Sequence, residues 1–233
     1  MQSIPLLNLS VVFLPTLALL MIMRRWRLAA GSGFYANARM LVQLLLVGYV
    51  LTFVFETDDW LVIIAIVVLM IGAAAAIALR SSNSKGIGNY TVLCFAIGVP
   101  GALMLILVTQ FVLQMERWFE PRFVIPIAGM IFANSMNSVA LSAERCDSEV
   151  AHGVGFLEAR RAALEAALIP QINSLLAVGL VALPGMMTGQ ILSGVDPLVA
   201  ARYQIMVMWM LFGSGGLSAV AYLSLSSKKA HPA

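Results

Sequence analysis

The stretch "ALIPQINSLLAVGLVALPGMMTGQIL" (residues 167–192) is long enough to cross a membrane, yet it differs from a simple membrane helix. It contains no charged residue, and about 20 apolar residues are enough to span a bilayer. Pro184 and Gly185 interrupt it, while Thr188 and Gln190 place hydrogen-bonding groups where lipid offers no partner. The stretch therefore predicts a membrane segment whose helix is broken for a reason.

The composition of the whole chain indicates an integral membrane protein. Of its 233 residues, 61% are hydrophobic and 11% are charged, whereas a soluble domain carries roughly 25% charged residues. Cys94 and Cys146 lie far apart and suggest neither a disulfide framework nor a thiolate metal site. The basic residues do not gather into the cluster that a nucleic-acid-binding face would need.

Outward from the opening stretch, the chain divides into seven apolar spans. We therefore expect an all-α, polytopic membrane protein whose residues 1–233 form a single transmembrane domain. The spans cover about 4–23, 33–55, 60–79, 91–114, 123–143, 167–192 and 197–225.

The charges of the loops predict the orientation of these spans. Basic residues follow spans 1, 3 and 5 and end the chain, whereas Glu56, Asp58 and Asp59 lie in an alternate loop. Because basic loops stay on the cytoplasmic side, we expect the N-terminus outside and the C-terminus in the cytoplasm.

Polar residues inside the spans are candidates for a solute pathway. Arg39 and Gln43, four residues apart in span 2, are interpreted as structural or gating residues, because arginine stays charged and can reach the cytoplasmic interface. Spans 5–7 hold most of the uncharged polar side chains. These could simply join helices by hydrogen bonds, or they could line a pathway.

Two proline-containing stretches fall at a similar expected depth in the outer half of the membrane. Pro126 in span 5 and Pro184 in span 6 could break their helices to form an outer gate, or they could be kinks that ease packing. The candidate pathway residues are Met130, Asn134, Asn137, Gln171, Asn173, Pro184, Gly185, Met186, Met187, Thr188, Gln190 and Gln204.

Enzyme motifs are missing from the sequence. It has no phosphate-binding G-x-x-x-x-G-K-[ST] loop and no H-E-x-x-H, and no carboxylate lies deep in a span. We therefore expect no catalytic residues, no cofactor and no confident metal site in this chain. Uphill transport would then take its energy from another polypeptide.

The longest hydrophilic insert, about 144–166, is expected on the cytoplasmic side. Its end, together with the start of the next span, reads "EVAHGVGFLEARRAALEAALIP" (149–170), which is rich in helix-forming residues. A short charged helix there could dock a soluble partner or could be an ordinary interfacial helix.

Four stretches closely resemble the FetB-like permeases. They are "ARMLVQLLLVGYVL" (38–51), "PIAGMIFANSMNSVALSAER" (126–145), the opening stretch extended to residue 197, and "ARYQIMVM" (201–208). That family includes bacterial iron exporters and plant aluminium-sensitivity membrane proteins. The resemblance implies a membrane subunit of an ABC transporter in the bacterial inner membrane, exporting iron or another metal ion. A separate cytoplasmic ATPase would bind ATP and magnesium.

The segment after span 5 departs from the family, because it is shorter than the loop of other members. Its start still fits the EAA-x-x-x-G element by which many ABC permeases contact their ATPase. The candidate docking residues are Glu149, Gly155, Glu158, Arg160 and Arg161. Since ATP-binding cassettes close as pairs, we expect a permease homodimer embedded in membrane lipid. The alternative is a self-sufficient secondary transporter or channel for a small solute.

Overall fold

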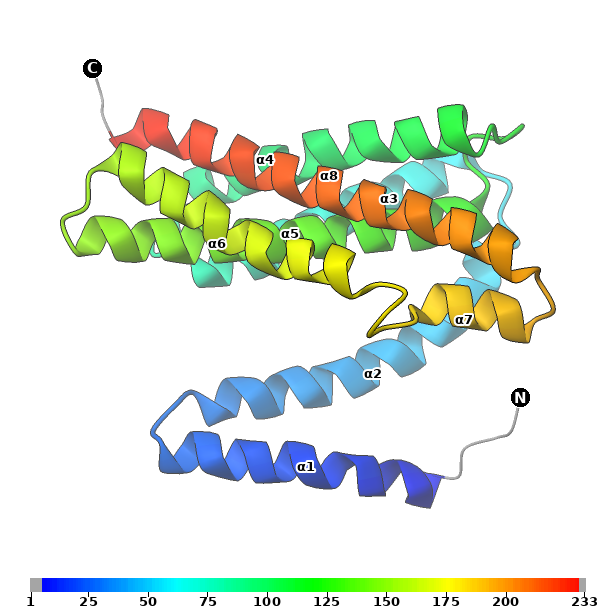
Figure 1. The fold of residues 1–233 in the computed structure, drawn as a ribbon, viewed down its shortest axis with the longest axis horizontal. Coiled ribbons are helices and arrows are strands. Elements are labelled where there is room, and N and C mark those ends of the chain that lie inside the picture. Colours follow the sequence, from blue (N-terminus) through cyan, green and yellow to red (C-terminus); the bar gives the residue numbers. More distant parts are fainter. Residues whose placement is uncertain (1–5, 231–233) are drawn as a thin grey trace. The chain divides into compact units, whose positions relative to one another are not determined.

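The computed structural model describes residues 6–230, which are helical apart from their turns and one isolated bridge between Val178 and Ala182. This confirms the all-α class (Figure 1). The elements are α1 (Leu6–Arg25), α2 (Ala30–Val54), α3 (Trp60–Ala78), the 3-10 turn η1 (Leu79–Ser81), α4 (Ile87–Ile106), the π-helical segment η2 (Leu107–Val112), α5 (Pro121–Ala151), α6 (Phe156–Ala177), α7 (Gly185–Leu192) and α8 (Pro197–Ala230).

Five stretches within residues 6–230 are long and apolar enough to cross a membrane. They are Ala30–Val54, Trp60–Ser81, Ile87–Val112, Pro121–Ala151 and Pro197–Ser226. The chain is therefore a multi-pass membrane protein by helix length and composition. The count of seven spans and the orientation remain predictions.

The chain forms two compact units, residues 1–57 and residues 58–233. In the first unit α1 contacts α2, and a side chain at Gly33 would come within 2.8 Å of Leu20. No residue of α2 is buried. Arg39 donates from Nε and Nη2 to the amide oxygen of Gln43, at 3.1 and 3.2 Å, when that oxygen faces the guanidinium. In that orientation the two residues interpreted as structural or gating are in contact.

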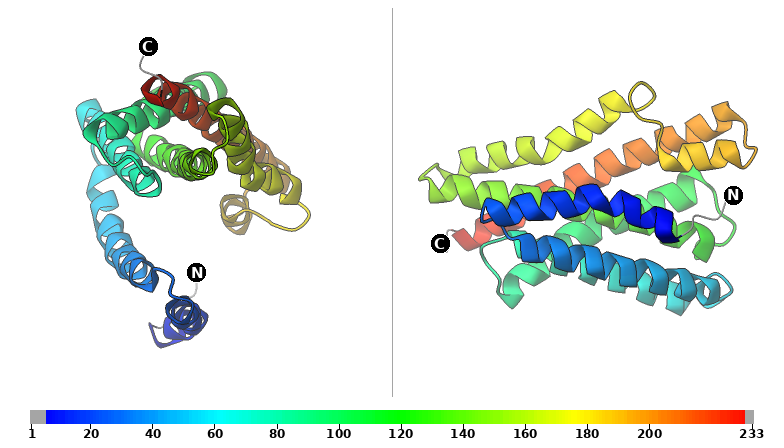
Figure 2. Two further views of the ribbon diagram at one scale, coloured as in Figure 1. Left: turned by 90° about the vertical axis from the view of Figure 1, so that its left-hand side faces the viewer. Right: turned by 90° about the horizontal axis from the view of Figure 1, so that it is seen from below.

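In the second unit α5 is the central helix. It contacts α3, α4, α6 and α8, and the end-on view in Figure 2 shows these helices around it. Acidic residues start two of the surrounding helices. Asp59 accepts from the main-chain N–H of Leu61 at 2.9 Å, and Asp196 accepts from that of Leu198 at 2.8 Å. Both side chains satisfy N–H groups that a helix leaves free at its first turn.

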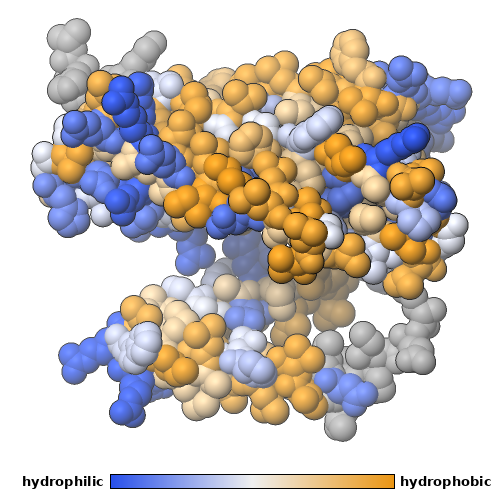
Figure 3. All heavy atoms as spheres, viewed as in Figure 1, coloured by the Kyte–Doolittle hydropathy of each residue, from blue (hydrophilic) through white to orange (hydrophobic). Residues whose placement is uncertain are grey.

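Hydrophilic and hydrophobic residues occupy different parts of the surface of the second unit. Figure 3 shows hydrophilic residues gathered toward its two ends and hydrophobic residues over the middle. At the end where α3 begins, the rings of Trp60 and Trp118 lie 6.4 Å apart. Tryptophan prefers the boundary between lipid and water, so this pair is consistent with a membrane interface at that end.

One expected helix break is wrong. α5 continues through Pro126, so this proline does not interrupt its helix. The missing N–H of Pro126 removes one backbone bond of α5, a loss that membrane helices tolerate where local groups satisfy the freed carbonyl. The predicted hydrophilic segment 144–166 is shared between two long helices. α5 extends to Ala151, and α6 begins at Phe156 and runs unbroken through Pro170.

The predicted break before Gly185 is confirmed. α6 ends at Ala177, and α7 begins at Gly185 with Pro184 as its N-cap residue. Between them Gly179 has φ +82°, a left-handed conformation that glycine adopts without strain. The hydroxyl of Thr188 donates to the carbonyl of Pro184 at 3.1 Å and so holds the first turn of α7. The sequence 167–192 therefore forms parts of two helices and not one.

Candidate functional site

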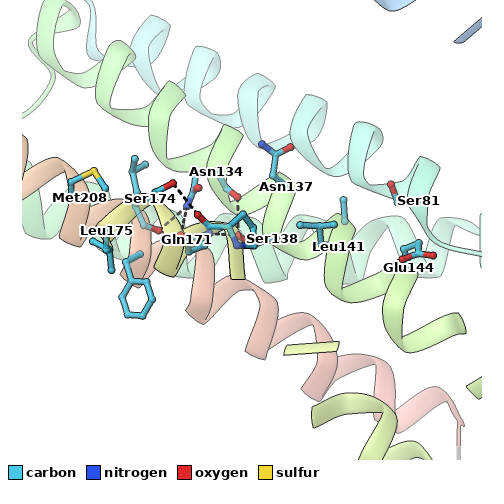
Figure 4. A pocket seen from close by; sticks show the side chains of 14 residues that line it. Ser81, Asn134, Asn137, Ser138, Leu141, Glu144, Gln171, Ser174, Leu175 and Met208 are labelled. Atoms are coloured by element: carbon cyan, nitrogen blue, oxygen red, sulfur yellow. Dashed lines mark hydrogen bonds between the residues drawn. The ribbon is translucent and has the colours of Figure 1, made fainter. Parts of the chain in front are cut away.

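A cavity of about 640 Å³ lies where α5, α6 and α8 meet, with η1 at one end. Its polar side chains are amides and hydroxyls together with one carboxylate, that of Glu144. The lining residues that carry them are Ser81, Asn134, Asn137, Ser138, Glu144, Gln171 and Ser174 (Figure 4). A cavity of this size can hold a small solute or a hydrated ion.

Three of these residues form what we call the amide cluster: Asn134, Ser138 and Gln171. Asn134 Nδ2 donates to Gln171 Oε1 at 3.3 Å and to the carbonyl of Leu211 at 2.7 Å. Gln171 Nε2 donates to Ser138 Oγ, which in turn donates to the Asn134 carbonyl at 3.1 Å. The cluster therefore joins α5, α6 and α8 through side chains that carry no charge.

Gly215 of α8 makes this close meeting possible. A Cβ at that position would lie 2.5 Å from Asn134 Nδ2 and 2.8 Å from Ser138 Oγ, and closer still to Gln171 Nε2. Real Cβ atoms do not approach neighbours so closely, because packed interiors leave no room for overlap. Only glycine lets the amide cluster sit against α8.

Helix packing explains how Gln171 reaches this position. The buried residues of α6 are Ala159, Ala163, Ala167 and Gln171, spaced by four residues and therefore on one face of the helix. Small side chains let helix backbones approach closely in a membrane. The alanine face brings α6 near α5 and directs the longer glutamine side chain into the junction.

Apart from the carboxylate of Glu144, the cavity offers weak, uncharged ligands. Amide and hydroxyl oxygens can accept hydrogen bonds from a solute or contact a hydrated cation. Met208 adds a thioether to the lining. Within residues 6–230 no group of three or more His, Cys, Asp or Glu side chains is placed to hold a metal ion.

Three of the predicted pathway residues come together in this cavity: Asn134, Asn137 and Gln171. The others lie elsewhere on α5, α6, α7 or α8. Asn173 is exposed on α6, and Met130 is half-buried on α5. Pro184, Gly185, Met186, Met187, Thr188 and Gln190 form or precede α7, which contacts α8. The predicted outer gate and the cavity are thus separate features.

Two glutamines, Gln190 of α7 and Gln204 of α8, each have a side-chain oxygen that lacks a hydrogen-bond partner among the described residues. Both oxygens are buried, and Gln204 is only 6% exposed. Buried amide oxygens usually have a partner, so each of these favours a water or another polar group at its site.

Sequence reasoning missed Ser138, Glu144 and Gly215. Ser138 follows Asn134 by four residues, a spacing that places both on one helix face. That spacing was the available signal, but serine and glycine are common in membrane helices for packing alone.

The candidate docking residues gather at the turn between α5 and α6, with Glu149 at the end of α5 and the others at or after the start of α6. Arg145 and Glu149 form an ion pair at 2.5 Å. Gly155 begins α6, and its carbonyl accepts from the N–H of Ala159 at 2.9 Å. Glu158 and Arg161 are exposed, and Arg160 is half-buried. This turn is therefore a charged, accessible end of the second unit.

Known proteins resemble nearly the whole chain. The model of the uncharacterised protein family UPF0014 matches residues 6–231. A UPF0014 membrane protein of Synechocystis is 34% identical over 206 residues, which are 82% of this chain and 80% of that protein. The Escherichia coli protein named "Probable iron export permease protein FetB" is 32% identical over 95% of this chain and 90% of its own length. Protein ALUMINUM SENSITIVE 3 of Arabidopsis thaliana is 29% identical over 82% of this chain and 74% of its own length. No solved structure matches the chain.

Proposed function

Because the chain belongs to the uncharacterised protein family UPF0014, we propose that it is the membrane-spanning permease subunit of an ABC transporter. In this proposal a separate ATPase subunit binds ATP and magnesium and drives export across the bacterial inner membrane. The observation that carries the proposal is the polar cavity between α5, α6 and α8. Polar side chains are costly inside a bilayer and are kept there mainly where they line a path or join helices.

The proposed cargo is iron or another metal ion. The name of the E. coli relative supports iron, and that relative is matched over 95% of this chain. The lining chemistry is compatible with transient contact to a hydrated cation. Glu144 offers one carboxylate, and it is the only charged side chain among the lining residues. A cation leaving the cytoplasm would meet that carboxylate in the predicted orientation.

The charged turn between α5 and α6 is the proposed contact with the ATPase. Glu158 and Arg161 are exposed there. Since α6 continues from this turn to the cavity, a force applied at the turn would reach the polar side chains without passing through a flexible loop. This continuity supports a motor-driven permease over a self-sufficient channel.

The working unit is proposed to be a homodimer. Leu180 and Val181, in the non-helical segment between α6 and α7, are 89% and 85% exposed. Ala177 ends α6 about 9 Å beyond Gln171, at 1.5 Å per residue. Gln171 is bonded to Asn134, which lies near the centre of the predicted span 123–143. The hydrocarbon layer extends about 15 Å from its centre, so the segment starts within it.

Non-helical backbone at that depth must be covered by protein or line water, because lipid cannot satisfy its polar groups. A second copy of the chain would supply such cover and would match the pairing of ATP-binding cassettes.

Transport by reconstituted components tests the proposed function. The chain is inserted into liposomes with and without its ATPase, and ATP-dependent movement of iron(II) is measured. Transport that requires both proteins and ATP is expected. Iron flux through the chain alone would instead support a self-sufficient transporter or channel.

A further inference from the structure

The amide cluster lies across the cavity. In Figure 4, Glu144 is near one end of the cavity, Met208 is near the other, and Asn134, Ser138 and Gln171 lie between them. Gln171 and Ser138 are only 8% and 2% exposed, although both are polar. A solute that moves from the carboxylate toward Met208 would move along these side chains.

The helix that carries Gln171 also carries the charged turn. α6 is one continuous helix from Phe156 to Ala177. Arg161 and Gln171 are about 15 Å apart along its axis, at 1.5 Å per residue. The buried face between them consists of Ala163 and Ala167. Such small side chains do not interlock deeply with a neighbouring helix, so α6 can shift along α5 with little repacking.

We propose that Gln171 closes this cavity to a solute, and that movement of α6 opens it. The hydrogen bonds from Gln171 to Ser138 and from Asn134 to Gln171 hold α6 against α5, while the bond from Asn134 to Leu211 holds α5 against α8. A shift of α6 separates Gln171 from Ser138 and Asn134 and widens the space between the two ends of the cavity. Gly215 is the positioning residue, because it leaves the space in which the three side chains meet.

Hydrogen bonds between uncharged groups suit a contact that has to open and close. Separation of the cluster exposes its amides and hydroxyl to the polar cavity, where water or the solute can replace the lost partners. The net cost of opening is then only that of exchanging one set of hydrogen bonds for another. Assigning the movement of α6 to an ATPase rests on the proposed function, but the closure by Gln171 does not.

The test measures access to Met208 from the Glu144 side. Met208→Cys is introduced into the full chain after Cys94 and Cys146 have been replaced by alanine. A membrane-impermeant maleimide is then applied to vesicles of each orientation. The labelling rate is compared in the parent and in Gln171→Leu, Gly215→Ala and Gly216→Ala. A second reporter, Asn137→Cys, is exposed on the lining of the cavity in the parent and controls for general access.

Gly216→Ala is the matched control, because its Cβ would meet only Leu168 at 3.5 Å, an ordinary contact distance. We expect Gln171→Leu and Gly215→Ala each to raise labelling of Met208→Cys roughly tenfold or more, because both variants disrupt the hydrogen bonds that hold the closed arrangement. Gly216→Ala should label like the parent, and Asn137→Cys should label equally in all backgrounds. If Gln171→Leu and Gly215→Ala share one mechanism, their double variant should label no faster than the faster single variant.

Equal labelling of Met208→Cys in all four backgrounds would overturn the proposal. Should Gly215→Ala fail to insert, Gln171→Leu alone decides between these results. The labelling requires neither ATP nor an identified solute. A failure of ATP-driven transport would therefore leave this result intact, and unchanged labelling would reject the closure even if transport is observed.

Discussion

Asn134 donates a hydrogen bond to the main-chain carbonyl of Leu211 at 2.7 Å, and this bond joins α5 to α8 beside the cavity. The carbonyl of Leu211 belongs to a helix, so it accepts this donor in addition to its place in the helical backbone. The same nitrogen reaches Gln171 on α6. The side-chain amide of Asn134, which belongs to α5, therefore contacts both of the other helices that enclose the cavity, α6 and α8.

Removal of this amide should lower the stability of the helix bundle. Asn134→Ala leaves the buried oxygen of Gln171 without its donor, which should cost about 1–3 kcal/mol. Thermal unfolding in detergent checks this loss. Asn137→Ala is the control, since Asn137 lines the same cavity but is exposed. Equal unfolding temperatures for the two variants would show that the bonds of Asn134 contribute nothing to stability.

The exposed segment between α6 and α7 should lie near a second copy of the chain. In a background without native cysteines, Val181→Cys treated with a bifunctional maleimide in membranes should give a product of twice the chain mass. Leu69→Cys is a suitable control, because Leu69 is 70% exposed but lies within α3. Cover by α1 and α2 of the same chain would leave Val181→Cys at the mass of a single chain and would contradict the dimer interface.

Reversal of charge at the α5–α6 turn should weaken binding of the ATPase. Arg161→Glu changes an exposed residue of α6 and should reduce co-purification of the ATPase without loss of membrane insertion. Arg122→Glu makes the same change at an exposed site at the opposite end of α5 and should leave co-purification unchanged. A similar effect of both variants would indicate a general charge effect and no specific docking at the turn.

The break before α7 should matter for transport more than for folding. A Cβ on Gly185 would have no atom within 4 Å, so the folded chain has room for a side chain there. Gly185→Leu should therefore keep membrane insertion and ATPase binding while it reduces ATP-dependent flux. Flux equal to that of the parent would show that this surface lies outside both the pathway and any close interface.

Substitution of Arg39 tests whether the first unit takes part in coupling ATP hydrolysis to transport. Its guanidinium makes two contacts with Gln43, and lysine cannot reproduce both of them. Arg39→Lys should keep assembly with the ATPase but lower the flux per ATP hydrolysed. An unchanged ratio of flux to hydrolysis would remove Arg39 from the coupling mechanism.

The sequence predicted helices better than it predicted their ends. Apolar runs located α2, α3, α4, α5 and α8, and Pro184 with Gly185 marked the break before α7. The charged stretch before span 6 was expected to be helical, but its continuity with span 6 as one helix was missed, because charged residues such as Arg161 end an apolar run but do not end a helix. Pro126 was misread because a membrane helix can lose the one backbone bond that a proline removes without ending there.

The sequence identified single candidate site residues, but it did not show which of them contact each other. Asn134 and Gln171 were identified because amides are expensive in lipid. Their partner Ser138 and the space left by Gly215 depend on how α5, α6 and α8 pack. That packing is a property of three helices together, and the pattern within one helix does not reveal it.

The most direct test of the account is iron(II) transport by the reconstituted chain and its ATPase, measured for the parent, Gln171→Leu and Gly216→Ala. The account predicts ATP-dependent transport in the parent and in Gly216→Ala. In Gln171→Leu it predicts ATP hydrolysis with much less net transport, because the cavity no longer closes. No ATP-dependent transport of iron or any other tested metal ion by the parent, with both proteins folded and assembled, would contradict the central claim.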